Sequence, residues 1–118
     1  MPAYYSVVQY FPEVIRDERI NIGVMTFDQN SETVYCKFLD NWDRVAHFVN
    51  NEHQLRFVKE WAESAMKDPW TASEIRKTIE KQGVYSTVWF RELAGSLRPA
   101  SQLVEDMAKS FLVNKTEA

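Results

Sequence analysis

The spacing of apolar residues changes along the chain, from a period of two to the period of a helix. Three N-terminal stretches are β-branched and aromatic with interspersed polar residues, as is typical of half-buried strands: residues 4–11, 19–27 and 33–39. Residues 41–83 follow helical spacing, residues 84–93 return to strand-like alternation, and Leu103 to Leu112 form a last amphipathic stripe. This order predicts an α+β fold, a mainly antiparallel four-stranded sheet (β-β-β-α-α-β-α) with helices packed on one face.

Polar residues mark the expected helix ends. Asn41 and Asn51 are each placed to cap a helix, and Asp68-Pro69 would stop the second of these. Thr71-Ala72-Ser73-Glu74 has the form of a capping box for a further helix. We expect that helix to end at Gly83, in a left-handed conformation that glycine adopts without strain.

Within residues 19–27, strict alternation predicts two different faces. Ile20, Ile22 and Val24 would share one face, and we expect them to form a core with the alternating residues of the next strand: Val34, Cys36 and Phe38. Asn21 and Gly23 would then project together from the other face. A glycine inside a strand is commonly a place where something approaches the backbone closely, either a helix or a ligand, and both alternatives stay open.

Composition limits the class of protein. A chain of 118 residues with 45% apolar types predicts a single domain over residues 1–118, with residues 114–118 as a flexible tail. A net charge of -3 gives no general attraction to nucleic acid or an acidic membrane. Cys36 is the only cysteine, which suits a reducing compartment, and we find no signal peptide or membrane span. We therefore expect a soluble, cytoplasmic protein.

Motifs for metal, cofactor or covalent chemistry are weak. His47 and His53 are six residues apart, which does not suit a metal shared from one helical face. Cys36 falls on the apolar side of its strand, where an inert thiol is expected. The chain's 3 glycines are isolated, so there is no Gly-rich phosphate loop. We predict no metal and no cofactor.

The run Arg16-Asp17-Glu18-Arg19 is the main candidate for a site. Neighbouring guanidinium groups keep a carboxylate such as that of Glu18 ionised, and each can bind a carboxylate or phosphate through two parallel hydrogen bonds. The cluster can therefore be a salt-bridged turn, a docking surface or a small active site. In the last case Arg16 and Arg19 would clamp an anion, Glu18 would act as acid/base or metal ligand, and Asn21 would orient the substrate.

The same region carries a family resemblance. Tyr4-Tyr5-Ser6-Val7-Val8-Gln9-Tyr10, Pro12 and the run from Arg16 to Val24 resemble the bacterial domain-of-unknown-function family 3037, with its Arg-x-Glu-x-x-Asn-x-Gly-Val signature. Phe90-Arg91-Glu92-Leu93 and the amphipathic helix that follows also fit this family. The resemblance implies a compact bacterial protein, sometimes encoded beside kinases similar to HipA, and no established activity. It points to Arg16, Glu18, Asn21 and Gly23 as signature positions.

Aromatic residues suggest a second candidate binding surface, whose rings would anchor a protein partner or stack on nucleic-acid bases. Four rings fall on the less aliphatic sides of expected strands and would form a row if no helix covered them: Tyr4, Tyr10, Tyr35 and Trp89. The alternative is that they pack beneath a helix.

Our first hypothesis is a non-catalytic accessory module that binds a protein partner through residues 16–21 and the adjoining sheet face, with a kinase similar to HipA as one candidate partner. Its binding residues would be Arg16, Glu18, Arg19, Asn21 and Gly23. The first alternative is a small enzyme or ligand-binding domain for an anionic or phosphorylated substrate. The second, less favoured by charge, is a protein that binds nucleic acid through the aromatic sheet face.

Overall fold

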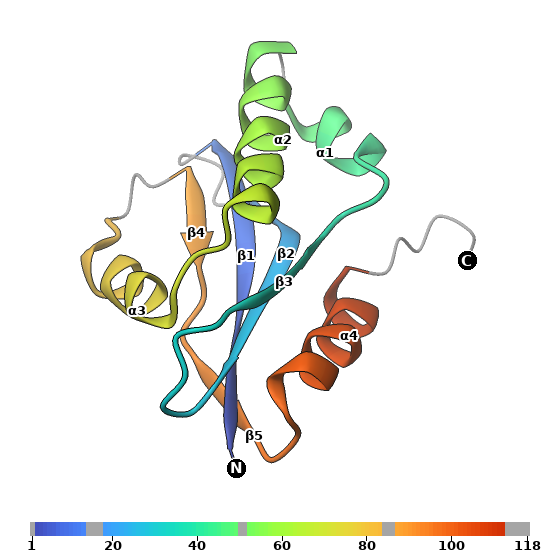
Figure 1. Ribbon diagram of the computed structural model, residues 1–118. Coiled ribbons are helices and arrows are strands. Elements are labelled where there is room, and N and C mark those ends of the chain that lie inside the picture. The colour runs from blue at the N-terminus through green and yellow to red at the C-terminus, as the bar shows by residue number, and fades with distance from the viewer. Residues whose placement is uncertain (1, 14–17, 50–51, 84–86, 113–118) are drawn as a thin grey trace.

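The computed structural model describes residues 2–13, 18–49, 52–83 and 87–112 (Figure 1). Within these ranges the elements follow in the order β1 (Ala3–Glu13), β2 (Glu18–Asp28), β3 (Tyr35–Phe38), α1 (Asp43–Phe48), α2 (Glu52–Lys67), α3 (Ala72–Lys81), β4 (Val88–Phe90), β5 (Ala94–Ser96) and α4 (Ala100–Phe111). The strands form one antiparallel sheet in the order β3-β2-β1-β4, and β5 pairs with the other end of β1. The predicted α+β class is confirmed, as is the pairing of the second strand with the first and the third.

The fourth strand, expected over residues 84–93, is divided. Val8 pairs with Phe90 and Tyr5 with Ala94, so two residues of β1 face three residues of the other chain segment. This extra residue separates β4 from β5, as at a β-bulge. Residues 84–86 of the expected strand lie outside the described residues.

A second bulge lies in β2. Val8 pairs with Gly23 and Gln9 with Asn21, so Ile22 is an extra residue between them. The bulge resets the alternation of side chains. Ile22 keeps its place in the larger core cluster, whereas Val24 lies on the opposite face. The position of Val24 follows from its cross-strand neighbour Lys37, which forms an ion pair with Glu105 of α4.

The expected faces of β2 are therefore corrected in part. Ile20, Ile22 and Val24 are all buried as predicted, but they do not share a face. The prediction that Asn21 and Gly23 project together is wrong, since the bulge lies between them.

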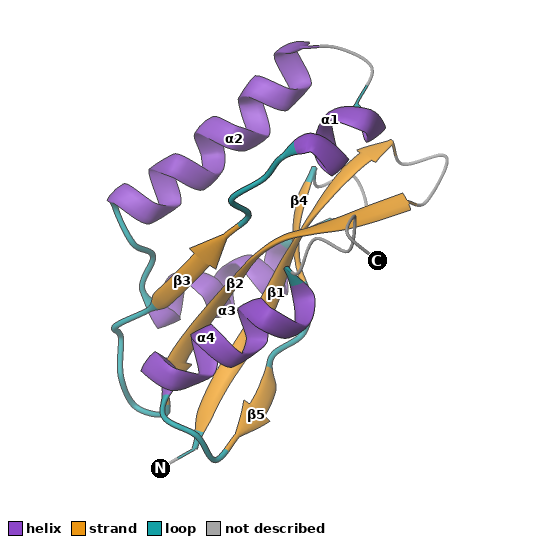
Figure 2. Cartoon of the chain, turned by 90° about the vertical axis from the view of Figure 1, so that its right-hand side faces the viewer, coloured by secondary structure: helices purple, strands orange, loops and turns teal. Residues whose placement is uncertain are grey.

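Helices cover both faces of the sheet rather than one. Figures 1 and 2 show α3 and α4 on opposite sides of the strands. The larger core cluster joins one face to residues of α1, α2 and α3, and a smaller cluster joins Ala3 to Ala100 and Leu103 of α4. Both faces of β1 and β2 are apolar, so each has to be buried against a helix layer.

The four rings do not form a row. Tyr10 is only 1% exposed and belongs to the larger core cluster. Tyr4 packs against the same cluster, and its ring centroid lies 5.8 Å from that of Phe27. Tyr35 and Trp89 pair with Thr26 and Gln9, which face α4. The rings are thus divided between the two faces, and packing beneath a helix holds for Tyr4 and Tyr10.

The helix ends follow the sequence in part. The capping box at α3 is present, since Glu74 N–H donates to Oγ1 of Thr71 (3.2 Å) and Thr71 N–H donates to Oε1 of Glu74 (2.8 Å). Asp43 N–H donates to Oδ1 of Asn41 (2.8 Å), but the N-cap residue of α1 is Trp42, one residue later than predicted. The prediction for Gly83 is wrong: α3 ends with Gln82 in an extended conformation, and no described glycine has a positive φ. Asn51 lies outside the described residues.

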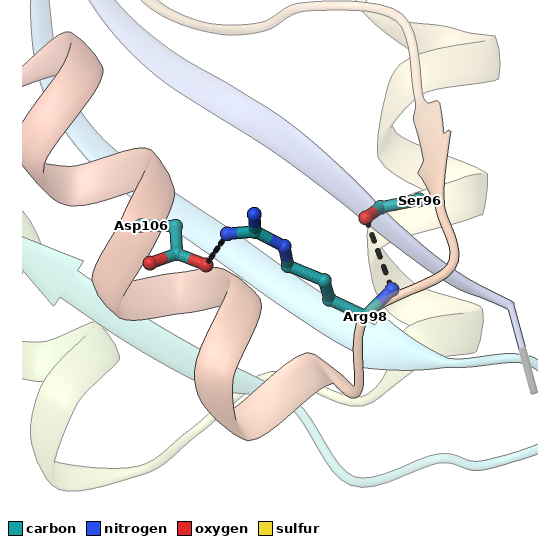
Figure 3. A network of polar contacts seen from close by, with 3 residues as sticks. All are labelled: Ser96, Arg98 and Asp106. Atoms are coloured by element: carbon teal, nitrogen blue, oxygen red, sulfur yellow. Dashed lines mark hydrogen bonds and ion pairs between the residues drawn. The ribbon is translucent and has the colours of Figure 1, made fainter.

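The start of α4 is held against β2. Thr26 Oγ1 donates to the carbonyl of Ala100 (2.8 Å), and Ala100 N–H donates to Oδ1 of Asp28 (2.9 Å). The loop between β5 and α4 is closed by Arg98, whose guanidinium donates to Asp106 of α4 and whose N–H donates to Oγ of Ser96, as Figure 3 shows. These contacts fix the start of α4 against β2.

Candidate functional site

Two adjoining clefts lie where α4 ends. The narrow cleft has a volume of about 130 Å³ and is lined by Arg19, Ile20, Asn21, Leu39, Asn41, Arg44, Phe111 and Leu112. The wide cleft has a volume of about 470 Å³ and is lined by Tyr5, Val7, Arg19, Trp89, Arg91, Glu92, Leu93, Ala94 and Phe111. Arg19 and Phe111 belong to both. The clefts exist because α4 ends at Phe111, beside Asn21, whereas β1 and β2 continue beyond it.

Arg19 is held between two rings. Its guanidinium carbon lies 5.1 Å from the ring centroid of Phe11 in β1 and 5.5 Å from that of Trp89 in β4. A guanidinium in this position is attracted by the faces of the two rings. Three neighbouring strands therefore fix this cation at the junction of the two clefts.

Asn21 has a structural role at the same junction. Its Oδ1 accepts from Nε2 of Gln9 (2.9 Å), and its Nδ2 donates to the carbonyl of Phe111 at the end of α4 (3.4 Å). The amide thus satisfies one of the last carbonyls of the helix, which have no partner within the helix. Oε1 of Gln9 is buried and has no hydrogen-bond partner among the described residues.

Gly23 does not belong to the clefts. It faces the opposite side of the sheet, where a Cβ atom would lie 2.4 Å from Cδ1 and Cε1 of Phe38. The expectation that a helix or a ligand closes on this glycine is wrong, because the close neighbour is a ring from the adjacent strand β3. Gly23 thus packs against Phe38 and lines neither cleft.

The rest of the predicted charged cluster is described only in part. Arg16 and Asp17 lie outside the described residues, and of Glu18 the structure describes only the backbone, which begins β2 and pairs with Glu13. Whether Arg16 and Glu18 bind a partner or hold the β1–β2 connection stays a prediction.

Other cleft residues could not be selected from the sequence. Arg44 comes from the first turn of α1 and Asn41 from the segment before it, while Phe111 ends α4 and Leu112 follows it. Tertiary packing alone brings these segments beside Arg19, and no local pattern indicates it. The bulge between β4 and β5 places Arg91 and Glu92 in the wide cleft.

The lining suits the binding of anions. It contains three guanidinium groups, those of Arg19, Arg44 and Arg91, whereas Glu92 supplies the only carboxylate among the described lining residues. No histidine, cysteine, serine or threonine is among them. Nucleophilic or general acid–base catalysis therefore has few candidate groups here.

The single cysteine and His47 line neither cleft. Burial raises the pKa of the Cys36 thiol, which contacts the carbonyl of Ala65 at 3.9 Å. His47 is exposed on α1, with Nδ1 2.8 Å from the carbonyl oxygen of Asp43. Within the described ranges, no group of three or more histidine, cysteine or acidic side chains is arranged to hold a metal ion.

Comparison with known proteins gives a family. Residues 5–96 match the model of a family described as "Protein of unknown function (DUF3037)". The chain belongs to the DUF3037 family. The match spans Arg19 and Asn21 of β2 and Arg91 between β4 and β5, and it ends before α4. Searches of curated proteins and of solved structures gave no match.

The helices were also compared with the requirements of a membrane span. Among the described residues, none of the helices combines the length and the apolar composition needed to cross a bilayer.

Proposed function

We propose that this DUF3037 protein is a non-catalytic module that binds an acidic segment of a protein partner at the narrow and wide clefts. The observation that carries the proposal is the convergence of Arg19, Arg44 and Arg91 on two clefts that share the ring of Phe111. Guanidinium groups bind carboxylates through paired hydrogen bonds, and Arg and aromatic residues are enriched among the residues that contribute most to protein interfaces.

The shape of the site supports a partner that lies across both clefts. Arg19 is already fixed by Phe11 and Trp89, so little side-chain entropy is lost when it binds an anion. Arg44 and Arg91 are exposed on either side of it and provide the outer cationic groups. An acidic segment would meet a fixed central cation and two flanking ones.

A small anionic ligand is the second candidate. The volume of the wide cleft, about 470 Å³, falls within the range of about 300–1,000 Å³ that is usual for small-molecule sites. The small number of catalytic groups among its described residues favours binding over turnover. Nucleic acid is less favoured, because the net charge of -3 gives no general attraction to phosphate backbones.

The experiment compares three immobilised proteins in an extract of the native host under reducing conditions, which suit the single thiol and the cytoplasmic location that we propose. They are the wild type, a cleft variant (Arg44→Glu with Arg91→Glu) and a control with the same change in charge on the exposed side of α2 (Arg56→Glu with Lys59→Glu). Bound proteins are identified by mass spectrometry.

We expect the wild type and the control to retain one stoichiometric partner that the cleft variant loses. A kinase similar to HipA stays a prediction for its identity. A partner retained equally by all three proteins would contradict the proposal. If no protein is retained but inorganic phosphate or a nucleotide raises the unfolding midpoint of the wild type alone, the small-ligand alternative replaces it.

A further inference from the structure

The helix α4 is held firmly at its start and loosely at its end. Its start is hydrogen-bonded to Thr26 and Asp28, and the buried residues of the helix all lie in its first half. In the last turn, residues 108–111, the side chains are half-buried or exposed. Within the described ranges, one hydrogen bond joins this turn to the sheet, from Nδ2 of Asn21 to the carbonyl of Phe111. Its length of 3.4 Å exceeds the usual range of about 2.7–3.2 Å.

The carbonyl of Phe111 also sets the orientation of two side-chain amides on the sheet. A carbonyl can only accept, so Asn21 turns its Nδ2 toward it and its Oδ1 toward Gln9. Nε2 of Gln9 donates to that Oδ1 at 2.9 Å, which leaves Oε1 of Gln9 buried and without a donor among the described residues. A buried acceptor without a donor is unfavourable. The attached position of the last turn therefore maintains an unfavourable group beside it.

The ring of Phe111 stands on the border between the narrow and the wide cleft, since it lines both. Its centroid lies 6.2 Å from that of Tyr5 in the wide cleft. If the last turn moves outward, this ring leaves the border and the two clefts become one groove. The same movement admits water to Oε1 of Gln9, which gains the missing hydrogen bond. The open turn thus loses one long hydrogen bond and gains another, so that the two positions are close in free energy.

We infer that the last turn of α4 is a gate, which separates the two clefts when it is closed and joins them when it is open. The inference rests on the proposed function for one point, that an acidic segment occupies the joined groove. Such a segment would reach Arg44 in the narrow cleft and Arg91 in the wide cleft, with Arg19 between them. While the gate is closed, a segment that crosses from one cleft to the other meets Phe111.

The first arm of the test measures amide hydrogen exchange at Phe111 and Leu112 without any partner. Gln9→Met removes the buried oxygen with little change of shape, and Asn21→Asp replaces the donor to Phe111 with a second acceptor. Gln102, exposed at the start of α4, supplies the matched controls Gln102→Met and Gln102→Glu. The amide of the buried Leu103 reports the stability of the whole fold.

The two variants should change exchange at the gate in opposite directions. We expect Gln9→Met to slow exchange at Phe111 and Leu112 severalfold, because the closed position no longer leaves a buried oxygen without a donor. Asn21→Asp should speed it severalfold, because a carboxylate repels the carbonyl of Phe111. Exchange at Leu103 and in both controls should match the wild type. If Gln9 and Asn21 only supported the helix end, both variants would speed exchange.

The second arm titrates a peptide of six glutamates as the probe. Binding should speed exchange at Phe111 and Leu112 of the wild type, a measurement that needs no variant. Phe111→Ala, which takes the ring off the border, should bind the probe severalfold more tightly than the wild type. Ser110→Ala, on the exposed side of the same turn, should bind it like the wild type.

The two arms separate the gate from the proposed function. Opposite changes in the first arm, without binding of the peptide to any of the proteins, would support the gate and count against the acidic partner. Changes in the same direction for Gln9→Met and Asn21→Asp would overturn the gate. A peptide that binds and leaves exchange at Phe111 and Leu112 unchanged or slower would overturn it as well.

Discussion

We expect the addition of a single methyl group at Gly23 to destabilise the fold. In Gly23→Ala the new Cβ would lie 2.4 Å from two ring carbons of Phe38 and 3.1 Å from the carbonyl oxygen of Lys37. The backbone itself is not strained, since no described glycine has a positive φ. The cost is therefore steric, and overpacking of this kind typically costs about 1–3 kcal/mol.

Thermal unfolding measures this cost. For a chain of 118 residues, an unfolding entropy of about 2.1 cal/mol/K per residue makes 1 kcal/mol equivalent to about 4 °C in the midpoint. We expect Gly23→Ala to lower the midpoint by about 4–12 °C. The control is Gly95→Ala in β5, where the nearest atoms to the new Cβ lie at 3.9 Å. That change should leave the midpoint equal or slightly raised, because alanine restricts the unfolded chain.

A second variant locates the clash. Phe38→Leu removes the ring, so the double variant Gly23→Ala with Phe38→Leu should lose less stability than the sum of the two single changes. If Gly23→Ala melts like Gly95→Ala, or if the two changes at residues 23 and 38 are additive, the close packing of Phe38 on this glycine is refuted.

Three other predictions concern an edge, a helix start and the charged cluster. Gln82→Leu leaves the N–H and C=O of the buried Phe90 without their side-chain partner. It should therefore lower the unfolding free energy, measured by denaturant titration, by about 1–3 kcal/mol. An unchanged midpoint would show that the hydrogen bonds from Gln82 do not stabilise the β4 edge. Hydrogen bonds from the first turn of α3 lower the pKa of Glu32 below its ordinary 4.5, so its stabilising effect is complete above that pH and is lost as pH falls through the lowered pKa. Glu32→Gln should therefore reduce stability at neutral pH and match the wild type in acid, and a difference independent of pH would contradict this. Arg16→Ala with Glu18→Ala should leave the midpoint nearly unchanged and weaken partner binding more than tenfold, whereas a loss of several kcal/mol, about 3–5, would make the cluster a buried structural one.

Local patterns predicted most of the secondary structure. The capping box at Thr71 and the amphipathic stripe of α4 depend on residues close in sequence, and the structure has both. The bulge at Ile22 does not, because it depends on how β2 pairs with β1. One extra residue was enough to move Val24 to the other face and to separate Asn21 from Gly23.

Two of the predicted binding residues line the clefts: Arg19 lines both, and Asn21 lines the narrow one. Their role in binding stays a prediction. Arg44 and Phe111 come from distant parts of the chain, and only the packing of α1 and α4 brings them there. Long-range packing of this kind leaves no signal in the spacing of a single sequence.

The central claim is that the cations of the two clefts bind an acidic partner, and calorimetric titration of the captured partner tests it most directly. Wild type, Arg44→Ala with Arg91→Ala, and the matched control Arg56→Ala with Lys59→Ala would be compared at one salt concentration, with the unfolding midpoint of each recorded. We predict a loss of affinity of more than tenfold, about 1.4 kcal/mol, in the cleft variant alone, with all midpoints nearly equal. Equal affinities for the three proteins would contradict the claim.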